Sequence, residues 1–148
     1  MDNYYLALYK GKGRWSDRLI RWWTGSIYSH AEIYVTKYEL CYSATFRDGG
    51  VRVKQIKVED SLNWDLIRIH LPMKGFMGRF KRQRGKKYDV INLFFTHFFK
   101  LGKHKKDKWT CAEMCAYLMG LPEAYKYSPK TLAIELERLN ESLPEKYN

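Results

Sequence analysis

The order of hydrophobic patterns along the chain is the strongest constraint on its fold. Alternating segments rich in β-branched and aromatic residues fill the first half and predict strands at 4–9, 29–36, 39–46, 51–58 and 64–71. After Pro72 the apolar spacing changes to i, i+3, i+4 and i+7, which predicts helices at 73–84, 90–99, 110–119 and 129–139. Strands gathered before helices favour an α+β domain, an antiparallel sheet with helices packed against it, over a doubly wound parallel sheet.

One domain accounts for the whole length. The 148 residues match the size of a single domain, and no linker, internal repeat or low-complexity segment divides them, so 1–148 is expected to fold as one unit. A short helix interrupts the strand-rich half. Ser16 is its predicted N-cap, an apolar stripe runs from Leu19 to Trp23, and Gly25 is its predicted end.

No transmembrane segment is predicted. The longest apolar stretch, 90–99, is about half of the roughly 20 residues that a spanning helix needs. The first residues, "MDNYYLALYKGKGR", have no basic leader and no small-residue cleavage site, so a cytoplasmic location is expected. A reducing compartment and an odd number of cysteines, three, both disfavour a disulfide framework.

The charge balance favours anionic partners. Lys and Arg number 27 against 16 for Asp and Glu, a net charge of +11, and the cations gather at 78–87 and 100–108. These clusters predict either a solvated face or a surface for nucleic acid or an anionic membrane. No zinc-finger spacing, RNP aromatic pattern or glycine-rich phosphate loop accompanies them, so only net charge supports nucleic-acid binding.

Two cysteines lie four residues apart in "KWTCAEMCAY", 108–117. The "TCAE" pattern is a capping box that predicts Thr110 as N-cap and Cys111 as the first helical residue. The free amides and the helix dipole at that position favour an anion, so the pKa of the Cys111 thiol should fall. Cys115, one turn later among alanines and Leu118, is expected to be a small buried apolar residue.

A zinc site is the main alternative for these cysteines. It would need Cys41 and one of four scattered histidines to complete a tetrahedron, and the chain has no second ligand pair with zinc-site spacing. Neither a metal nor a cofactor is therefore predicted.

A nucleophilic thiol needs a base, and His30 is the best-placed histidine. It begins an alternating strand directly after the loop "TGSIYS", and such strand ends commonly carry site residues. The other three have simpler positions: His70 at a strand end, His97 within an aromatic helix and His104 in a lysine-rich loop.

Glu32 shares a strand face with His30, because residues i and i+2 point to the same side. If Lys37 and Tyr38 form a two-residue turn, Glu32 faces Ser43 and His30 faces Thr45 on the neighbouring strand. A carboxylate beside an imidazole raises its basicity and fixes its tautomer. A surface salt bridge of Glu32 is the alternative.

These segments together resemble the circularly permuted branch of the NlpC-like papain-fold superfamily, relatives of the lecithin retinol acyltransferase group. The similarity rests on three motifs within 4–125: "SHAEIYV", "G-x-x-YD" at 85–89, and a Cys followed two residues later by Glu at a helix start. It implies a circularly permuted papain-like fold with Cys111 as nucleophile and His30 as base. The family's third polar residue comes from the strand after the histidine, which would be Ser43. A serine is a short orienter, so Glu32 is the preferred third residue and Ser43 the alternative.

The expected function is that of a thiol hydrolase, a cysteine protease or amidase that cleaves an amide or ester through a thioacyl-enzyme. A peptide, a muropeptide or a lipid is the expected substrate. Two alternatives stay open: a lipid-directed thiol acyltransferase, and a basic nucleic-acid-binding or interaction module without turnover.

Overall fold

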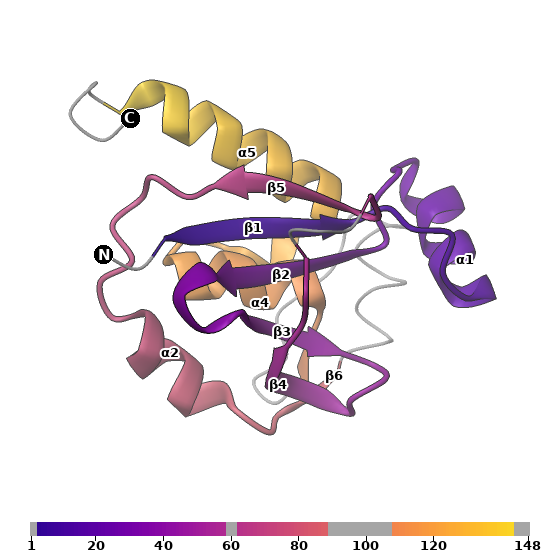
Figure 1. Cartoon of the computed structure of the whole chain (residues 1–148), viewed down its shortest axis with the longest axis horizontal. Coiled ribbons are helices and arrows are strands. Elements are labelled where there is room, and N and C mark those ends of the chain that lie inside the picture. Colours follow the sequence, from indigo (N-terminus) through magenta and orange to yellow (C-terminus); the bar gives the residue numbers. More distant parts are fainter. Residues whose placement is uncertain (1–2, 59–61, 89–107, 144–148) are drawn as a thin grey trace.

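The computed structural model describes residues 3–58, 62–88 and 108–143, which form an α+β fold (Figure 1). Its sheet has seven strands in the order β5-β1-β2-β3-β4-β6-β7, and every neighbouring pair is antiparallel except β6 and β7. The strands are β1 (Tyr4–Tyr9), β2 (His30–Val35), β3 (Leu40–Thr45), β4 (Gly50–Gln55), β5 (Trp64–Arg68), β6 (Lys87–Tyr88) and β7 (Lys108–Trp109). The helices are α1 (Trp15–Thr24), α2 (Phe76–Gln83), α4 (Cys111–Met119) and α5 (Pro129–Ser142), with the 3-10 turns η1 (Thr36–Tyr38) and η2 (Ala124–Lys126).

The predicted α+β class and antiparallel sheet are confirmed, with local corrections. Helix α1 begins at Trp15 rather than after Ser16, because the Asp17 carboxylate accepts the Arg14 amide at 2.7 Å and makes Arg14 the N-cap. Helix α2 begins at Phe76, because Gly75 before it has a left-handed φ of 79°. The predicted helix at 90–99, Asp89 and most of the basic cluster 100–108 lie outside the described residues.

The main core lies between the sheet and helix α4, which packs behind β2 and β3 (Figure 1). Ile33 of β2, Met114 and Leu118 of α4 and Leu132 of α5 are all fully buried there. The described helices are too short or too polar to traverse a bilayer.

Helix α2 is an ordinary surface helix packed on the sheet. The rings of Phe76 and Phe80 meet Tyr42 of β3 at centroid distances of 5.0 and 4.8 Å. Arg79 turns back to donate to the Leu118 carbonyl at 2.7 and 3.0 Å, so one cation of the predicted basic cluster satisfies the C-terminal end of α4.

The hairpin between β2 and β3 has the register that a turn at Lys37 and Tyr38 predicts. Its pairs run from Val35↔Leu40 to Ile33↔Tyr42. The turn is closed by the Glu39 amide, which donates to the Thr36 carbonyl at 3.2 Å. Glu32 and Ser43 are the next residues beyond the last pair, so this register brings the predicted site residues to the same part of the sheet.

Candidate active site

Helix α4 begins at Cys111, as the capping box predicts. The Glu113 amide donates to Thr110 Oγ1 at 3.2 Å, and the Thr110 amide donates to Glu113 Oε2 at 3.3 Å. Both capping residues are buried, which fixes the helix start against the sheet. Because α4 packs on β2, Cys111 meets the beginning of that strand, where His30 lies.

The environment of Cys111 favours its thiolate. Its side chain is only 2% exposed, and burial alone would raise the pKa of the thiol. The positive charge of His30, a hydrogen bond from its ring and the backbone N–H groups of Ala31 and Ala112 outweigh burial and lower the pKa of Cys111. The sulfur therefore sits where a negative charge is held by one cation and by amide donors from both β2 and α4.

His30 lies between the thiol and a carboxylate. Its Nε2 is 2.8 Å from Glu32 Oε1, and its ring also forms a hydrogen bond with Cys111. Burial alone would lower the pKa of His30, but the charge and hydrogen bond of Cys111, followed by those of Glu32, raise the pKa of the imidazole well above its ordinary value. The ring is 20% exposed, so among Cys111, His30 and Glu32 it is the side chain that solvent reaches most.

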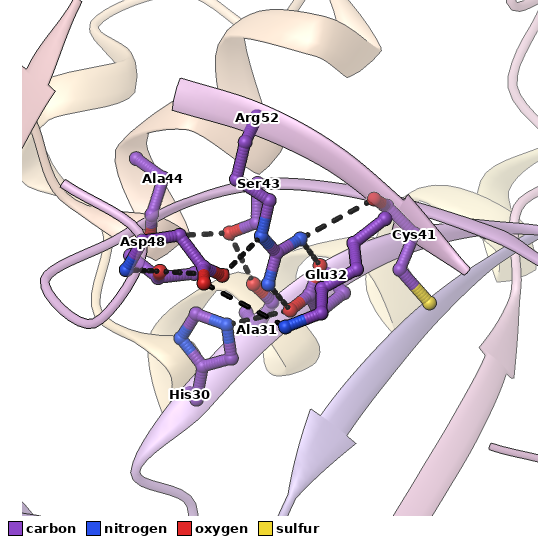
Figure 2. A network of polar contacts seen from close by, with 10 residues as sticks. His30, Ala31, Glu32, Cys41, Ser43, Ala44, Asp48 and Arg52 are labelled. Carbon is purple, nitrogen blue, oxygen red and sulfur yellow. Dashed lines mark hydrogen bonds and ion pairs between the residues drawn. The ribbon is translucent and has the colours of Figure 1, made fainter. Parts of the chain in front are cut away.

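Glu32 is itself held by a two-pronged contact from Arg52 of β4 (Figure 2). Each terminal nitrogen of the guanidinium lies 2.6 Å from one carboxylate oxygen, and Arg52 Nε donates to Asp48 Oδ2 at 2.9 Å. Burial alone would raise the pKa of Glu32, but hydrogen bonds from Arg52 and His30, together with their charges, lower it. At 1% exposure this carboxylate stays ionised only because of these two partners.

The five groups form one line of alternating charge: Cys111, His30, Glu32, Arg52 and Asp48. Each charge in the line has an opposite charge on the next member, so the buried charges offset one another. The line starts at a helix N-terminus, crosses β2 and β4, and ends in the turn between β3 and β4.

Ser43 supports the strand of His30 rather than the imidazole ring. Its hydroxyl donates to the Ala31 carbonyl at 2.6 Å and lies 3.4 Å from the Ala44 carbonyl. It also forms a hydrogen bond with Cys115. The structure thus brings Cys111, His30 and Glu32 into contact and places Ser43 beside them, against the backbone of β2.

Sequence reasoning missed Arg52 and Asp48. A signal was present in the second hairpin, because the "RDGG" turn pairs β3 with β4 so that Ser43 lies opposite Arg52. Extending the first register, in which Glu32 faces Ser43, across one more strand would have aligned Glu32 with Arg52. The Arg52 side chain extends across β3 to contact Glu32. This contact joins two hairpins, so it cannot be predicted from either hairpin alone.

The other two cysteines differ from Cys111. All three thiols are free, and Cys41 and Cys115 are fully buried. Burial raises the pKa of both, and the nearby Glu32 carboxylate raises each further, as does Cys111 in the case of Cys115. Within the described ranges, no group of three or more His, Cys, Asp or Glu side chains is arranged to hold a metal ion.

Comparisons with protein-family models and with curated proteins identify no relative that would assign a function to this site. No protein-family model matches the chain, and no curated protein matches it significantly.

Proposed function

We propose that the chain is a cysteine-dependent hydrolase of the peptidase or amidase type, with Cys111 as nucleophile and His30 as general base and acid. The observation that carries the proposal is the buried, hydrogen-bonded line from Cys111 through His30 to Glu32. A thiol with a lowered pKa, a histidine in contact with it and a carboxylate that orients the histidine are the three parts of an activated nucleophile.

The first chemical step is attack of the Cys111 thiolate on an amide or ester carbonyl. The new sulfur–carbon bond pushes the carbonyl electrons onto oxygen, and the Cys111 amide, one of the first amides of α4, is free of intrahelical bonding and can donate to that oxyanion. As the carbonyl re-forms, the bond to the leaving group breaks and His30 gives its proton to the departing amine or alcohol. A thioacyl-enzyme and a neutral imidazole remain.

The second step reverses these roles. Neutral His30 takes a proton from water while the water oxygen attacks the thioacyl carbon. Collapse of this intermediate releases the carboxylic acid and leaves Cys111 as thiolate beside protonated His30. An alcohol or amine in place of water would turn the same steps into acyl transfer.

Glu32 acts as a positioning residue in this scheme. Its contact with Nε2 fixes the ring beside the thiol and stabilises the imidazolium of the resting pair. Arg52 occupies both carboxylate oxygens and keeps Glu32 ionised, so that Glu32 holds the ring without taking its proton.

The proposed arrangement is that of a circularly permuted papain-like hydrolase, because the histidine strand precedes the cysteine helix in the chain. The chemistry suits a peptide, a muropeptide or an acylated lipid, since each presents an amide or ester carbonyl. The substrate class is defined by whichever of these three compounds the protein hydrolyses in an activity assay.

Trapping the acyl-enzyme tests the proposal. Wild-type protein is incubated with activated acyl esters and peptide anilides, quenched in acid and measured by intact-protein and peptide mass spectrometry. The expected result is one acyl group on Cys111, lost in Cys111→Ala and retained in Cys115→Ala. Turnover that survives in Cys111→Ala would contradict the proposal.

A further inference from the structure

Exposed apolar side chains gather at the end of the sheet that carries His30. At this end β1 finishes at Tyr9 opposite His30, and β5 begins at Trp64 opposite Tyr9. Six of the nine large apolar side chains exposed in the described ranges belong to the segments that meet here: Trp15, Leu19, Trp22, Ile27, Phe46 and Leu62. Scattered apolar residues are normal on a surface, whereas a gathering at one end marks an interaction site.

Helix α1 contributes the main stripe of this apolar end. Trp15, Leu19 and Trp22 follow each other at i, i+4 and i+7 and are 76%, 37% and 79% exposed. Such a stripe normally packs against the core. Here α1 projects beyond the end of the sheet (Figure 1). The three side chains of its stripe are exposed instead of packed on the core.

Specific polar contacts anchor α1 in this orientation. The Arg21 guanidinium donates to the carbonyls of Lys10 and Lys12 at 3.2 and 3.0 Å and also to that of Gly11. On its inner side, Asp17 pairs with Arg47 of the turn between β3 and β4 at 2.6 Å. The polar side of α1 therefore faces the protein through bonded contacts, which leaves the apolar stripe to the outside.

The charges around the stripe are positive. Lys12, Arg14 and Arg18 are exposed beside it. Among the residues that the structure describes, the carboxylates at this end are each engaged by another cation, in the pairs Asp17–Arg47, Asp48–Arg52 and Asp65–Lys10. The described part of this end thus presents excess positive charge, which complements an anionic surface.

We propose that α1 and the neighbouring tips at Ile27 and Phe46 dock on an anionic lipid bilayer. Tryptophan with basic neighbours on an amphipathic helix is the combination that binds the boundary between headgroups and acyl chains. A second copy of the chain fits less well, because the cations around the stripe would face one another in a symmetric dimer. A nucleic acid offers no apolar surface for Leu19 and Ile27.

Docking in this orientation gives the candidate active site a substrate class. Ile27 lies three residues before His30, so the membrane would adjoin the exposed edge of the imidazole. On the basis of the proposed function, the scissile amide or ester belongs to a lipid or to a chain anchored at the membrane surface. The docking itself needs no reactive thiol.

Vesicle sedimentation tests the docking. Full-length Cys111→Ala protein is mixed with vesicles of phosphatidylcholine alone or with added phosphatidylglycerol, and the bound fraction is measured against lipid concentration. Binding should require the anionic lipid and weaken with salt. The double variant Trp15→Ala/Trp22→Ala should lose it at least about tenfold. Lys12→Gln/Arg18→Gln should weaken it by about fivefold for each cation removed.

Matched controls are Tyr38→Ala, an exposed aromatic residue at the opposite end of the sheet, and Ile134→Ala, an exposed apolar residue on α5. Both should bind vesicles like the parent, and thermal melts should show every variant folded. Equal binding to neutral and anionic vesicles, or unchanged binding in the tryptophan variant, would overturn the proposal. So would a lipid-independent dimer that only the tryptophan variant abolishes. Because Cys111→Ala is used throughout, failure of docking leaves the hydrolase proposal standing, and the reverse also holds.

Discussion

The Glu32 carboxylate lies 2.8 Å from Nε2 of His30, two residues earlier on the same strand, while Arg52 holds both of its oxygens. The i, i+2 spacing puts the two side chains on one face of β2, and the arginine from β4 fixes the carboxylate from the other side. The orientation of the proposed base therefore depends on a residue that lies 22 positions away in the sequence.

Replacing Glu32 with Gln should cost activity and stability together. The neutral amide no longer stabilises the imidazolium, so the pKa of His30 should fall and that of Cys111 should rise. Turnover should drop on the order of a hundredfold, with a narrower kcat/KM against pH profile. Arg52 loses its buried partner charge, so the free energy of unfolding should fall by about 3 kcal/mol. Glu135→Gln, which breaks an exposed pair with Arg138, is the control and should cost about 0–1 kcal/mol. An unchanged pH profile of kcat/KM in Glu32→Gln would show that this carboxylate does not act on His30 during turnover.

Replacing Arg52 with Met should move the acid limb of the pH profile. In the parent protein the pKa of Glu32 is lowered. The stability that ionised Glu32 contributes is therefore complete above the ordinary carboxyl pKa and is lost as the pH falls through the lowered pKa. Without Arg52 that pKa should rise, and activity and stability should fail at a higher pH than in the parent. Arg52→Lys keeps the positive charge but cannot contact both carboxylate oxygens as the guanidinium does. The pH of its acid limb should lie between those of the parent and of Arg52→Met. A purely structural role would reduce the amount of folded protein and leave the limb where it is.

Replacing His30 with Ala should abolish turnover, by on the order of a hundredfold or more, while the fold is retained. His70→Ala is the matched control, because that residue lies beyond β5 and its backbone amide donates to Asn140. Steady-state kinetics and circular dichroism would be measured for both. Near-full activity of His30→Ala would rule out His30 as the base that acts with Cys111.

Cys111 and Cys115 should respond in opposite ways to substitution. Cys111→Ala should end covalent catalysis with little loss of stability, since the Thr110 capping box holds the helix start. Cys115→Ser places a more polar hydroxyl in the core beneath α4, where the Ser43 hydroxyl can partner it in part, and should cost about 1 kcal/mol. Thermal melts with and without a chelator would be set beside turnover. Equal destabilisation by both, with chelator sensitivity of the parent, would instead indicate a metal site.

Local signals carried most of what the sequence predicts correctly. The capping box placed Cys111 at a helix start, the i, i+2 spacing set Glu32 beside His30, and the turn at Lys37 fixed the register that aligns Glu32 with Ser43. All three depend only on residues close in sequence. The two-residue strands β6 and β7 are too short for any periodic signal, and β7 pairs in parallel with a distant segment. Arg52 reaches Glu32 across a strand, which pairwise hairpin reasoning does not capture.

Helix α1 shows the opposite case. The sequence predicted an apolar stripe from Leu19 to Trp23 and did not include Trp15, which the structure adds to the helix. Apolar spacing cannot distinguish a stripe that packs on a core from one that faces outward. The structure settles the direction for Trp15, Leu19 and Trp22 through the contacts that Arg21 and Asp17 make on the other side of the helix.

The most direct test of the Cys111–His30 pair is the pH dependence of Cys111 alkylation. Iodoacetamide rates would be followed at each cysteine by peptide mass spectrometry from pH 5 to 10, in wild type and in His30→Ala. The account predicts that Cys111 reacts first and reaches its plateau well below the ordinary thiol pKa of about 8.5, and that His30→Ala moves this plateau to higher pH. Faster labelling of Cys41 or Cys115 in the folded protein, or an identical Cys111 profile in both proteins, would contradict it.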